Sequence, residues 1–472
     1  MKNIIFILIL LFIYQNFIYS QKKGSSIQFN GSIESVVDLT HPKFINNGYF
    51  RWGFQNQANL RLKSNIGEYM TINLAVNINT ITGNYTDLYK YLYVAEAFSS
   101  FPDIMNISEA KLMQNTFYSI PFYYKNTFVG SFELERLSFK GGNDYFDIEA
   151  GLIRLARGFG NVFSPNDFFN PRDAFRLARP EGKMAVVATF YPEDFWKIQN
   201  FIVAPDNPLE SRGWGFKGGV STDFSIKKFN FQFQYALLMP EMDWGKDPKD
   251  YGLPETTQND FSHIAGFSMK ADIEIGLFLD MIYRFDHRVL YTQKYYGRDF
   301  HGYEGLEASI GFDYTIPFAN SNIYLLCEYM FYGSGMLHFS GDEHISNMYR
   351  KNGERMSYKD WVETPVIDRT SYFDQSKKSL NFLRHNYLFG MIRMKVNDYL
   401  NIGNSYMFGA DDQSGILSLF FDIEPFQSFS INITAMYPFD WKLANNEWIA
   451  GEFGATNLGF YQNYKITMKV KF

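Results

Sequence analysis

The feature that most constrains the fold is a two-residue alternation in segments of ten residues or more. In residues 463–472, NYKITMKVKF, apolar and polar side chains alternate without a break. The same alternation occurs in 229–237, 306–316 and 429–437. Because successive side chains of a strand point to opposite faces, each segment predicts a strand with one apolar face. Soluble sandwich strands run about 5 to 6 residues, whereas strands of about ten cross a bilayer at a tilt.

Reading all such segments predicts about eighteen strands, with sixteen as the alternative count. The expected ranges are 26–37, 49–63, 69–79, 130–140, 145–154, 183–191, 195–204, 213–224, 228–239, 260–272, 276–286, 305–316, 322–333, 385–396, 399–409, 414–423, 428–438 and 463–472.

The connections between these strands alternate in length. Short ones such as GGND, PED and SIKK fall at every second junction, and the others extend to about fifty residues, notably 80–129 and 334–384. Short turns at one end and long loops at the other are typical of outer-membrane barrels. The sequence therefore predicts an all-β chain: a transmembrane antiparallel up-and-down β-barrel that forms one domain over residues 21–472.

The segment 1–20 has the pattern of a secretory signal peptide, with Lys2 before an apolar run from Ile4 to Ile13. Its apolar core falls short of the roughly 20 residues that a spanning helix needs. We therefore expect an exported, multi-pass protein of a Gram-negative-type cell outer membrane. The composition fits strands that are apolar on one face, because 19% of the residues are aromatic while the mean hydropathy is −0.24.

Charge and cysteine content exclude other classes. A formal net charge of −6 leaves no basic footprint for nucleic acid. The single cysteine, Cys327, excludes an intramolecular disulfide framework. Zinc-protease and serine-hydrolase motifs are absent, so we expect neither an enzyme nor a cofactor. Residues 338–344, HFSGDEH, could bind a metal weakly, but a solvated loop tip is the favoured interpretation.

The polar faces of the predicted strands point into the barrel and carry both signs of charge. Mixed charge indicates a water-filled lumen without an ionic preference, since one-sided selectivity needs a ring of one sign. Alternatively, the charges pair across the lumen and plug it. The predicted lumen-lining residues are Arg51, Arg61, Lys217, Arg284, Asp280, Glu307, Asp313 and Glu328.

The connection 155–182 contains NVFSPNDFFNPRDAFRLARPEGK and is too long and too rich in Phe for a turn. We expect it to fold inward and narrow the pore. The spacing of Asp167, Asn170 and Asp173 invites a calcium site, but Asn-Pro and Ser-Pro pairs initiate turns, which favours a structural role. The candidate residues of the constriction are Arg154, Arg157, Asp167, Asp173, Arg172, Arg176, Arg179 and Glu181.

About sixty residues around this connection resemble a segment of Gram-negative outer-membrane barrels of mostly unassigned, porin-like function. The shared pattern is a loop Asp-x-x-Asn-Pro-x-Asp followed by Arg-Pro, present here as Asp167 to Asp173 and Arg179-Pro180. The family's Arg-Gln pair is Leu152-Ile153 here. The resemblance implies a transport barrel with this loop folded inward. It also implies that Phe472, on the apolar face, is read by the barrel-assembly machinery.

One predicted strand contains an irregularity. In 130–140, Glu133 and Glu135 fall on one face and Arg136 on the other, which predicts a β-bulge or a misplaced strand boundary there.

We therefore expect a porin-like channel for passive diffusion of small hydrophilic solutes, embedded in outer-membrane lipid. An adhesion barrel with a plugged lumen is the alternative, and an outer-membrane hydrolase a further one. The sequence does not indicate an oligomeric state.

Overall fold

The structure is a computed structural model of the chain. It describes residues 26–42, 51–67, 69–83, 119–124, 128–169, 182–204, 217–238, 262–285, 305–318, 321–333, 350–351, 354–355, 385–411, 413–440 and 460–472.

The described ranges contain β-strands. None of them contains a helix that is long and apolar enough to cross a membrane. The strands are β1 (Ser26–Pro42), β2 (Arg51–Ile66), β3 (Met70–Gly83), β4 (Ser119–Tyr124), β5 (Phe128–Gly142), β6 (Phe146–Ile153), β7 (Lys183–Glu193), β8 (Trp196–Val203), β9 (Lys217–Ile226), β10 (Phe229–Leu238), β11 (Ser262–Asp272), β12 (Gly276–Phe285), β13 (Leu306–Phe318), β14 (Ser321–Tyr332), β15 (Arg350–Lys351), β16 (Glu354–Arg355), β17 (Asn386–Lys395), β18 (Leu400–Gly409), β19 (Ser414–Phe426), β20 (Phe429–Asp440) and β21 (Phe460–Lys471).

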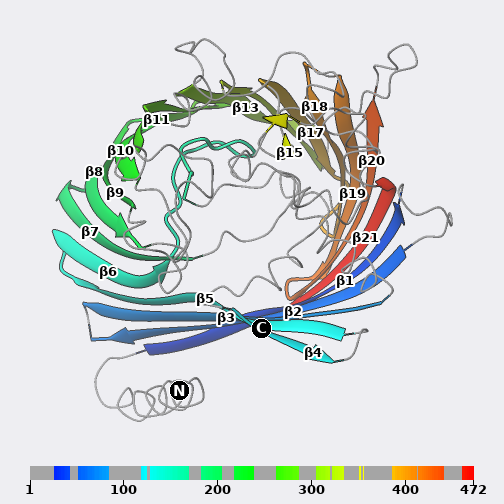
Figure 1. Cartoon of the computed structure of the whole chain (residues 1–472), viewed down its shortest axis with the longest axis horizontal. Helices are drawn as coiled ribbons and strands as arrows, with labels where there is room; N and C mark the ends of the chain where they lie inside the picture. Colours follow the sequence, from blue (N-terminus) through cyan, green and yellow to red (C-terminus); the bar gives the residue numbers. More distant parts are fainter. Residues whose placement is uncertain are drawn as a thin grey trace.

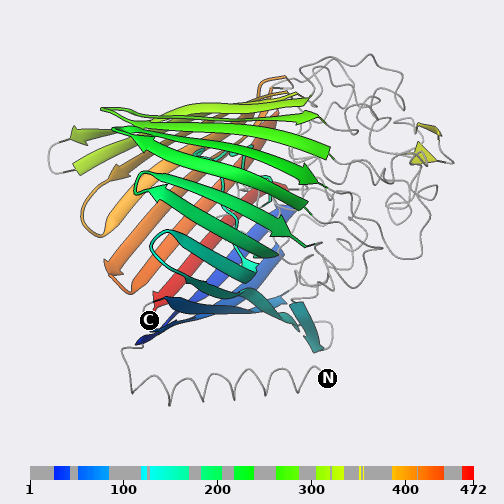
Figure 2. The ribbon, with the colours of Figure 1, turned by 90° about the vertical axis from the view of Figure 1, so that its left-hand side faces the viewer.

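Eighteen of the described strands form a closed antiparallel barrel. Each barrel strand pairs with the barrel strands before and after it in the sequence. β1 pairs with both β2 and β21, which closes the ring. Figure 1 shows the ring and Figure 2 the tilt of its strands. β4 is an extra strand on β5, and β15 and β16 form a separate pair.

The prediction of an eighteen-strand barrel is confirmed, and every predicted range overlaps one strand of the wall. The connections 80–129 and 334–384 are not loops throughout, because β4 lies in the first and β15 and β16 in the second. Sequence reasoning missed them because a strand of two to six residues is too short to show a clear alternation.

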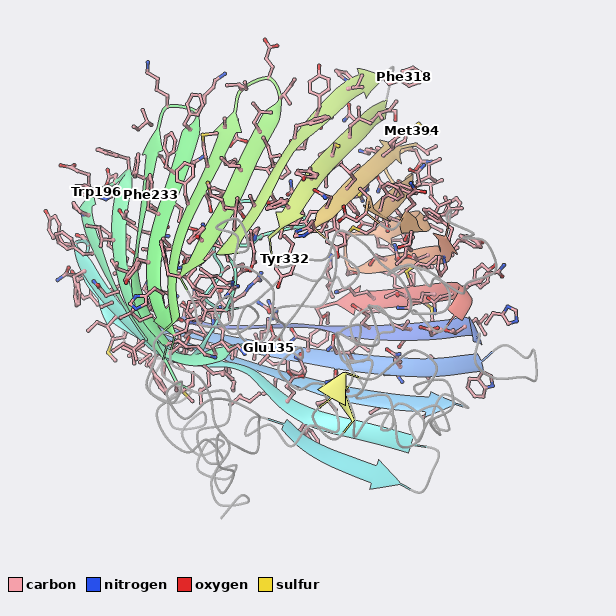
Figure 3. All side chains as sticks on the ribbon, turned by 45° about the horizontal axis from the view of Figure 1, so that its top comes forward. Glu135, Trp196, Phe233, Phe318, Tyr332 and Met394 are labelled. Atoms are coloured by element: carbon pink, nitrogen blue, oxygen red, sulfur yellow. The ribbon has the colours of Figure 1, made fainter. Side chains whose placement is uncertain are left out.

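Large apolar side chains cover the outer face of the barrel. Ile310 is 57% exposed, Ile202 59% and Phe233 44%; Phe233 alternates with the inward Gln232 and Gln234, and Ile202 with the inward Phe201 and Val203 of the buried cluster. Figure 3 shows side chains such as those of Phe233 and Trp196 on the outside of the wall. A surface of this kind is stable in lipid and unfavourable in water, as expected for a membrane barrel.

The predicted bulge in β5 is confirmed. The pairing of β3 with β5 shifts between Ala75 and Val76, so that Glu135 is the extra residue. Its carboxylate accepts a hydrogen bond from Asn59 Nδ2 at 2.6 Å and lies 3.1 Å from Arg61 Nη2. The bulge thereby adds a carboxylate to the inner face of β5 (Figure 3).

Candidate functional site in the barrel lumen

A segment of irregular structure, residues 154–169, leaves the wall where β6 ends at Ile153 and lies inside the ring of strands (Figure 1). We call it the inward segment. Gly158 has a φ of 78°, a left-handed conformation that favours glycine. A Cβ at this position would also clash with the Asp280 carboxylate, so the close approach to the wall requires glycine here.

Two carboxylates of the wall hold the backbone of the inward segment. Asp280 on β12 accepts hydrogen bonds from Phe159 N at 2.9 Å, Gly160 N at 3.0 Å and Ser164 Oγ at 2.7 Å. Glu328 on β14 accepts from the backbone nitrogens of residues 162 and 163, each at 2.8 Å. Both side chains are 0% exposed. Hydrogen bonds to charged acceptors contribute about 1.5–3 kcal/mol each, so this clamp fixes the position of the segment.

Amide and hydroxyl side chains of the wall extend this attachment. Gln232 accepts from Gly158 N at 2.7 Å, and Gln234 donates to Asn166 O at 2.7 Å. Asn166 also bonds to Ser268 on β11. The wall makes room for Asn166 at Gly266, where any Cβ would overlap the Asn166 amide.

Apolar contacts seal the two ends of the inward segment. Leu155 and Phe169 pack in a buried cluster with inward side chains of β7 and β8, and Phe169 meets Phe201 edge-on at 5.3 Å between ring centroids. Further along, Phe163 lies 6.4 Å from Tyr387 on β17. The segment is therefore packed against the wall rather than suspended in the lumen.

Arg157 and Asp167 lie between the segment and the wall. Arg157 is 5% exposed, donates to Gln199 Oε1 at 2.7 Å, and stacks over the Phe201 ring at 5.4 Å. Asp167 is 0% exposed. Both side chains are covered by protein, so they hold the segment in place and do not present their charge to a passing solute.

The attachment divides the inner wall into two parts. Between β8 and β14 the inward side chains beneath the segment are covered, including Ser221 and Ile282 at 1% exposure, whereas Lys197 and Lys270 on the same strands are 38% and 37% exposed. On the inner face of β1–β5, which the segment does not contact, the side chains of Arg61 and Arg136 are each 41% exposed, although Asp38 and Ser138 there are 0% exposed. We call these the covered sector and the exposed sector.

Opposite charges pair throughout the exposed sector and its neighbours. The pairs, with their nitrogen–oxygen distances, are Arg61–Glu135 and Arg136–Glu149 at 3.1 Å, Lys140–Asp147 and Lys469–Glu34 at 3.0 Å, and Arg393–Asp422 at 3.2 Å. Pairing without strong burial leaves these side chains hydrated and cancels most of the net field along this wall.

The other predicted lumen residues take several positions. Arg284 pairs with Glu307 at 2.7 Å, and Asp313 and Lys217 lie on inward positions of β13 and β9. Arg154 is exposed just after β6. The side chain of Arg51 is not described, and the remaining constriction candidates lie outside the described residues: Arg172, Asp173, Arg176, Arg179 and Glu181.

A metal site finds no support in the part of the chain that the structure describes, where no cluster of three His, Cys, Asp or Glu side chains is placed to hold an ion. Residues 338–344 and Asn170 lie outside it.

Sequence reasoning missed the wall residues that receive the inward segment, chiefly Gln232, Gln234 and Gly266. A glycine inside a strand marks a close approach of another group, so Gly266 in the alternating run 262–272 was a usable signal. The partner of that glycine was not predictable, because Asn166 is a hundred residues earlier in the sequence.

A closed antiparallel barrel with an apolar outer face, a polar inner face and short turns at one end is an outer-membrane β-barrel protein. No protein-family model matches the chain, and the comparison with curated proteins gives no match.

Similar solved structures are barrels of the same kind. OpdK of Pseudomonas aeruginosa has 7% identity over 95% of this chain and 98% of its own, with a TM-score of 0.47. Wzi of Escherichia coli, described as a carbohydrate-binding outer-membrane barrel involved in group 1 capsule assembly, has 11% identity over 97% and 86%, with a TM-score of 0.46. OprB of Pseudomonas putida has 9% identity over 94% of each chain, with a TM-score of 0.43. Likeness at this level assigns no role to any residue.

Proposed function

We propose that this protein is a porin-like channel for passive diffusion of small hydrophilic solutes across an outer membrane. The observation that carries the proposal is that the inward segment covers only part of the inner wall. Charged side chains elsewhere on the inner wall stay about two-fifths exposed, among them Arg61, Arg136 and Arg393. An eighteen-strand barrel has room for an aqueous channel beside such a segment.

The mechanism is selection by size and hydrogen bonding, with no covalent step. The segment narrows the lumen from one side, and its attachment by Asp280 and Glu328 keeps the width constant. A permeating solute must bind weakly enough to leave. Paired charges on the exposed sector meet this condition, because they keep the path hydrated without binding an ion tightly.

The test is conductance of the purified protein in planar lipid bilayers, followed by exclusion of neutral polymers of graded size. We expect stepwise currents that small polymers reduce and large polymers do not. Absence of any current in a correctly folded barrel would refute the channel and favour the adhesion barrel with a plugged lumen.

The constriction prediction extends to Arg176 and Arg179. We propose that these two residues contribute a transverse field, so that replacing both by Gln changes ion selectivity. An unchanged reversal potential in a salt gradient would contradict this part of the proposal.

A further inference from the structure

The inner face of β1–β3 carries an unusual density of amide side chains. The registers of β1 with β2 and of β2 with β3 bring them to the lumen side in adjacent rows. We call this set the amide track; its members are Asn30, Gln57, Asn59, Asn73, Asn77 and Asn79.

Hydrogen bonds orient these amides across the strands. Gln57 Nε2 donates to Asn79 Oδ1 at 2.9 Å, and Asn59 Nδ2 donates to Asn77 Oδ1 at 2.5 Å. Asn59 Oδ1 in turn accepts from Arg61 Nε at 2.7 Å. Gln57, Asn59, Asn77 and Asn79 are therefore held in fixed orientations, which is a condition for recognising a solute by hydrogen bonds.

The track is accessible from the lumen. Gln57 and Asn30 are exposed, and the Arg61 side chain beside them is 41% exposed. The exposed fractions of Asn59 and Asn77 are only 3% and 7%, so these two residues support the exposed members of the track. The inward segment makes its described contacts with other strands and leaves this face uncovered.

Most charges around the track are paired with an opposite charge. The pairs are Arg61–Glu135, Arg136–Glu149, Lys469–Glu34 and Lys465–Asp38. A wall of this kind attracts neither anions nor cations strongly. Its selectivity must therefore come from hydrogen bonding.

An amide side chain presents an N–H donor and a carbonyl acceptor side by side. A hydroxyl group also donates and accepts, so a pair of adjacent hydroxyls can satisfy both halves of one amide. Carboxylates accept only and ammonium groups donate only, so each matches just one half. Rows of fixed amides in a neutral field consequently suit a neutral solute with many hydroxyl groups.

We propose that the amide track is the solute-binding path of the channel and that it selects neutral polyhydroxylated solutes, such as short saccharides. The proposal rests on the proposed channel function, and it adds the solute class and the residues that recognise it. The solute moves along β1–β3, beside the inward segment rather than over it.

The test measures block of the ion current by a solute. Maltotetraose is added to the full-length protein in planar bilayers, and polyethylene glycol of equal hydrodynamic radius is the matched solute, because its ether oxygens accept hydrogen bonds but its chain does not donate them. We expect the saccharide to block at a concentration about tenfold lower, equivalent to ~1.4 kcal/mol.

Variants assign the effect to the track. Gln57→Met with Asn79→Leu removes one cross-strand amide pair at nearly constant volume and should weaken saccharide block about tenfold, with the ion conductance retained. Gln57→Met alone changes only an exposed side chain and should give a smaller loss. The control is Asn401→Leu, an amide on the inner face of β18 outside the track, which should leave block unchanged.

The outcomes separate the two proposals. If the unmodified protein carries no current, the channel itself is refuted. If it conducts, but the saccharide and the polymer block equally or the track variants block like the unmodified protein, the channel stands and the amide track has no part in selection.

Discussion

Replacing Asp280 by Asn should release the inward segment from the wall. The carboxylate accepts from three donors, Phe159 N, Gly160 N and Ser164 Oγ, at 2.7–3.1 Å, and it is fully buried. The Asn side chain keeps the shape, but its NH₂ group faces one of these donors and its remaining oxygen is uncharged. One charge-assisted hydrogen bond is lost and the others weaken.

The size of the effect follows from those contacts. A charge-assisted hydrogen bond contributes about 1.5–3 kcal/mol, and a neutral one about 1 kcal/mol. We therefore expect the attached state to lose about 3 kcal/mol relative to the released one. At 1.4 kcal/mol per factor of ten, the released population rises about 100-fold.

Amide hydrogen exchange measures that population directly, because an amide exchanges only while its hydrogen bond is open. A peptide that covers residues 158–164 should exchange about 100-fold faster in Asp280→Asn, and peptides of β1–β3 should not change. Glu34→Gln is the matched control: it also neutralises a lumen carboxylate, but one that pairs with Lys469 and does not touch the segment. If exchange in 158–164 is the same in all three proteins, the carboxylate does not hold the segment.

Three further predictions concern the wall. Gly266→Ala should displace Asn166 and raise single-channel conductance or its noise, whereas Gly390→Ala, at a position with open space, should leave conductance unchanged; equal currents in both variants would contradict the close fit. Phe312→Arg places a charge on the lipid face of β13, 41% exposed, and should cost about 2–4 kcal/mol of barrel stability, measured by urea unfolding in lipid vesicles; a loss under about 0.5 kcal/mol would place this residue outside the hydrocarbon region. Glu135→Gln should loosen both Asn59 and Arg61, shift the channel toward anion selectivity and move the reversal potential in a salt gradient; a fixed potential would show that the pair does not face the ion path.

The candidate constriction illustrates what could not be predicted from the sequence. Of the connection 155–182, the structure describes residues 155–169 and 182, and residues 155–169 pack against the inner wall. The burial of Arg157 and Asp167 was not predictable from the sequence. In the sequence both look like exposed charges of a loop, and only the position of the wall shows that they are covered. Arg157 is covered by Phe201 and Gln199 of β8, and the alternation of β8 gives no sign of this contact.

The sequence by itself determined the barrel, its strand count to within two, the two faces of most strands and an irregularity between Glu133 and Arg136. These properties are local: the two-residue period of a strand and the mismatch of one residue can be read along the chain. Only the tertiary structure decided which lumen residues hold the inward segment and which face open space. That distinction depends on pairs such as Gly160 with Asp280 and Phe163 with Glu328, which are more than a hundred residues apart and meet only when the ring closes.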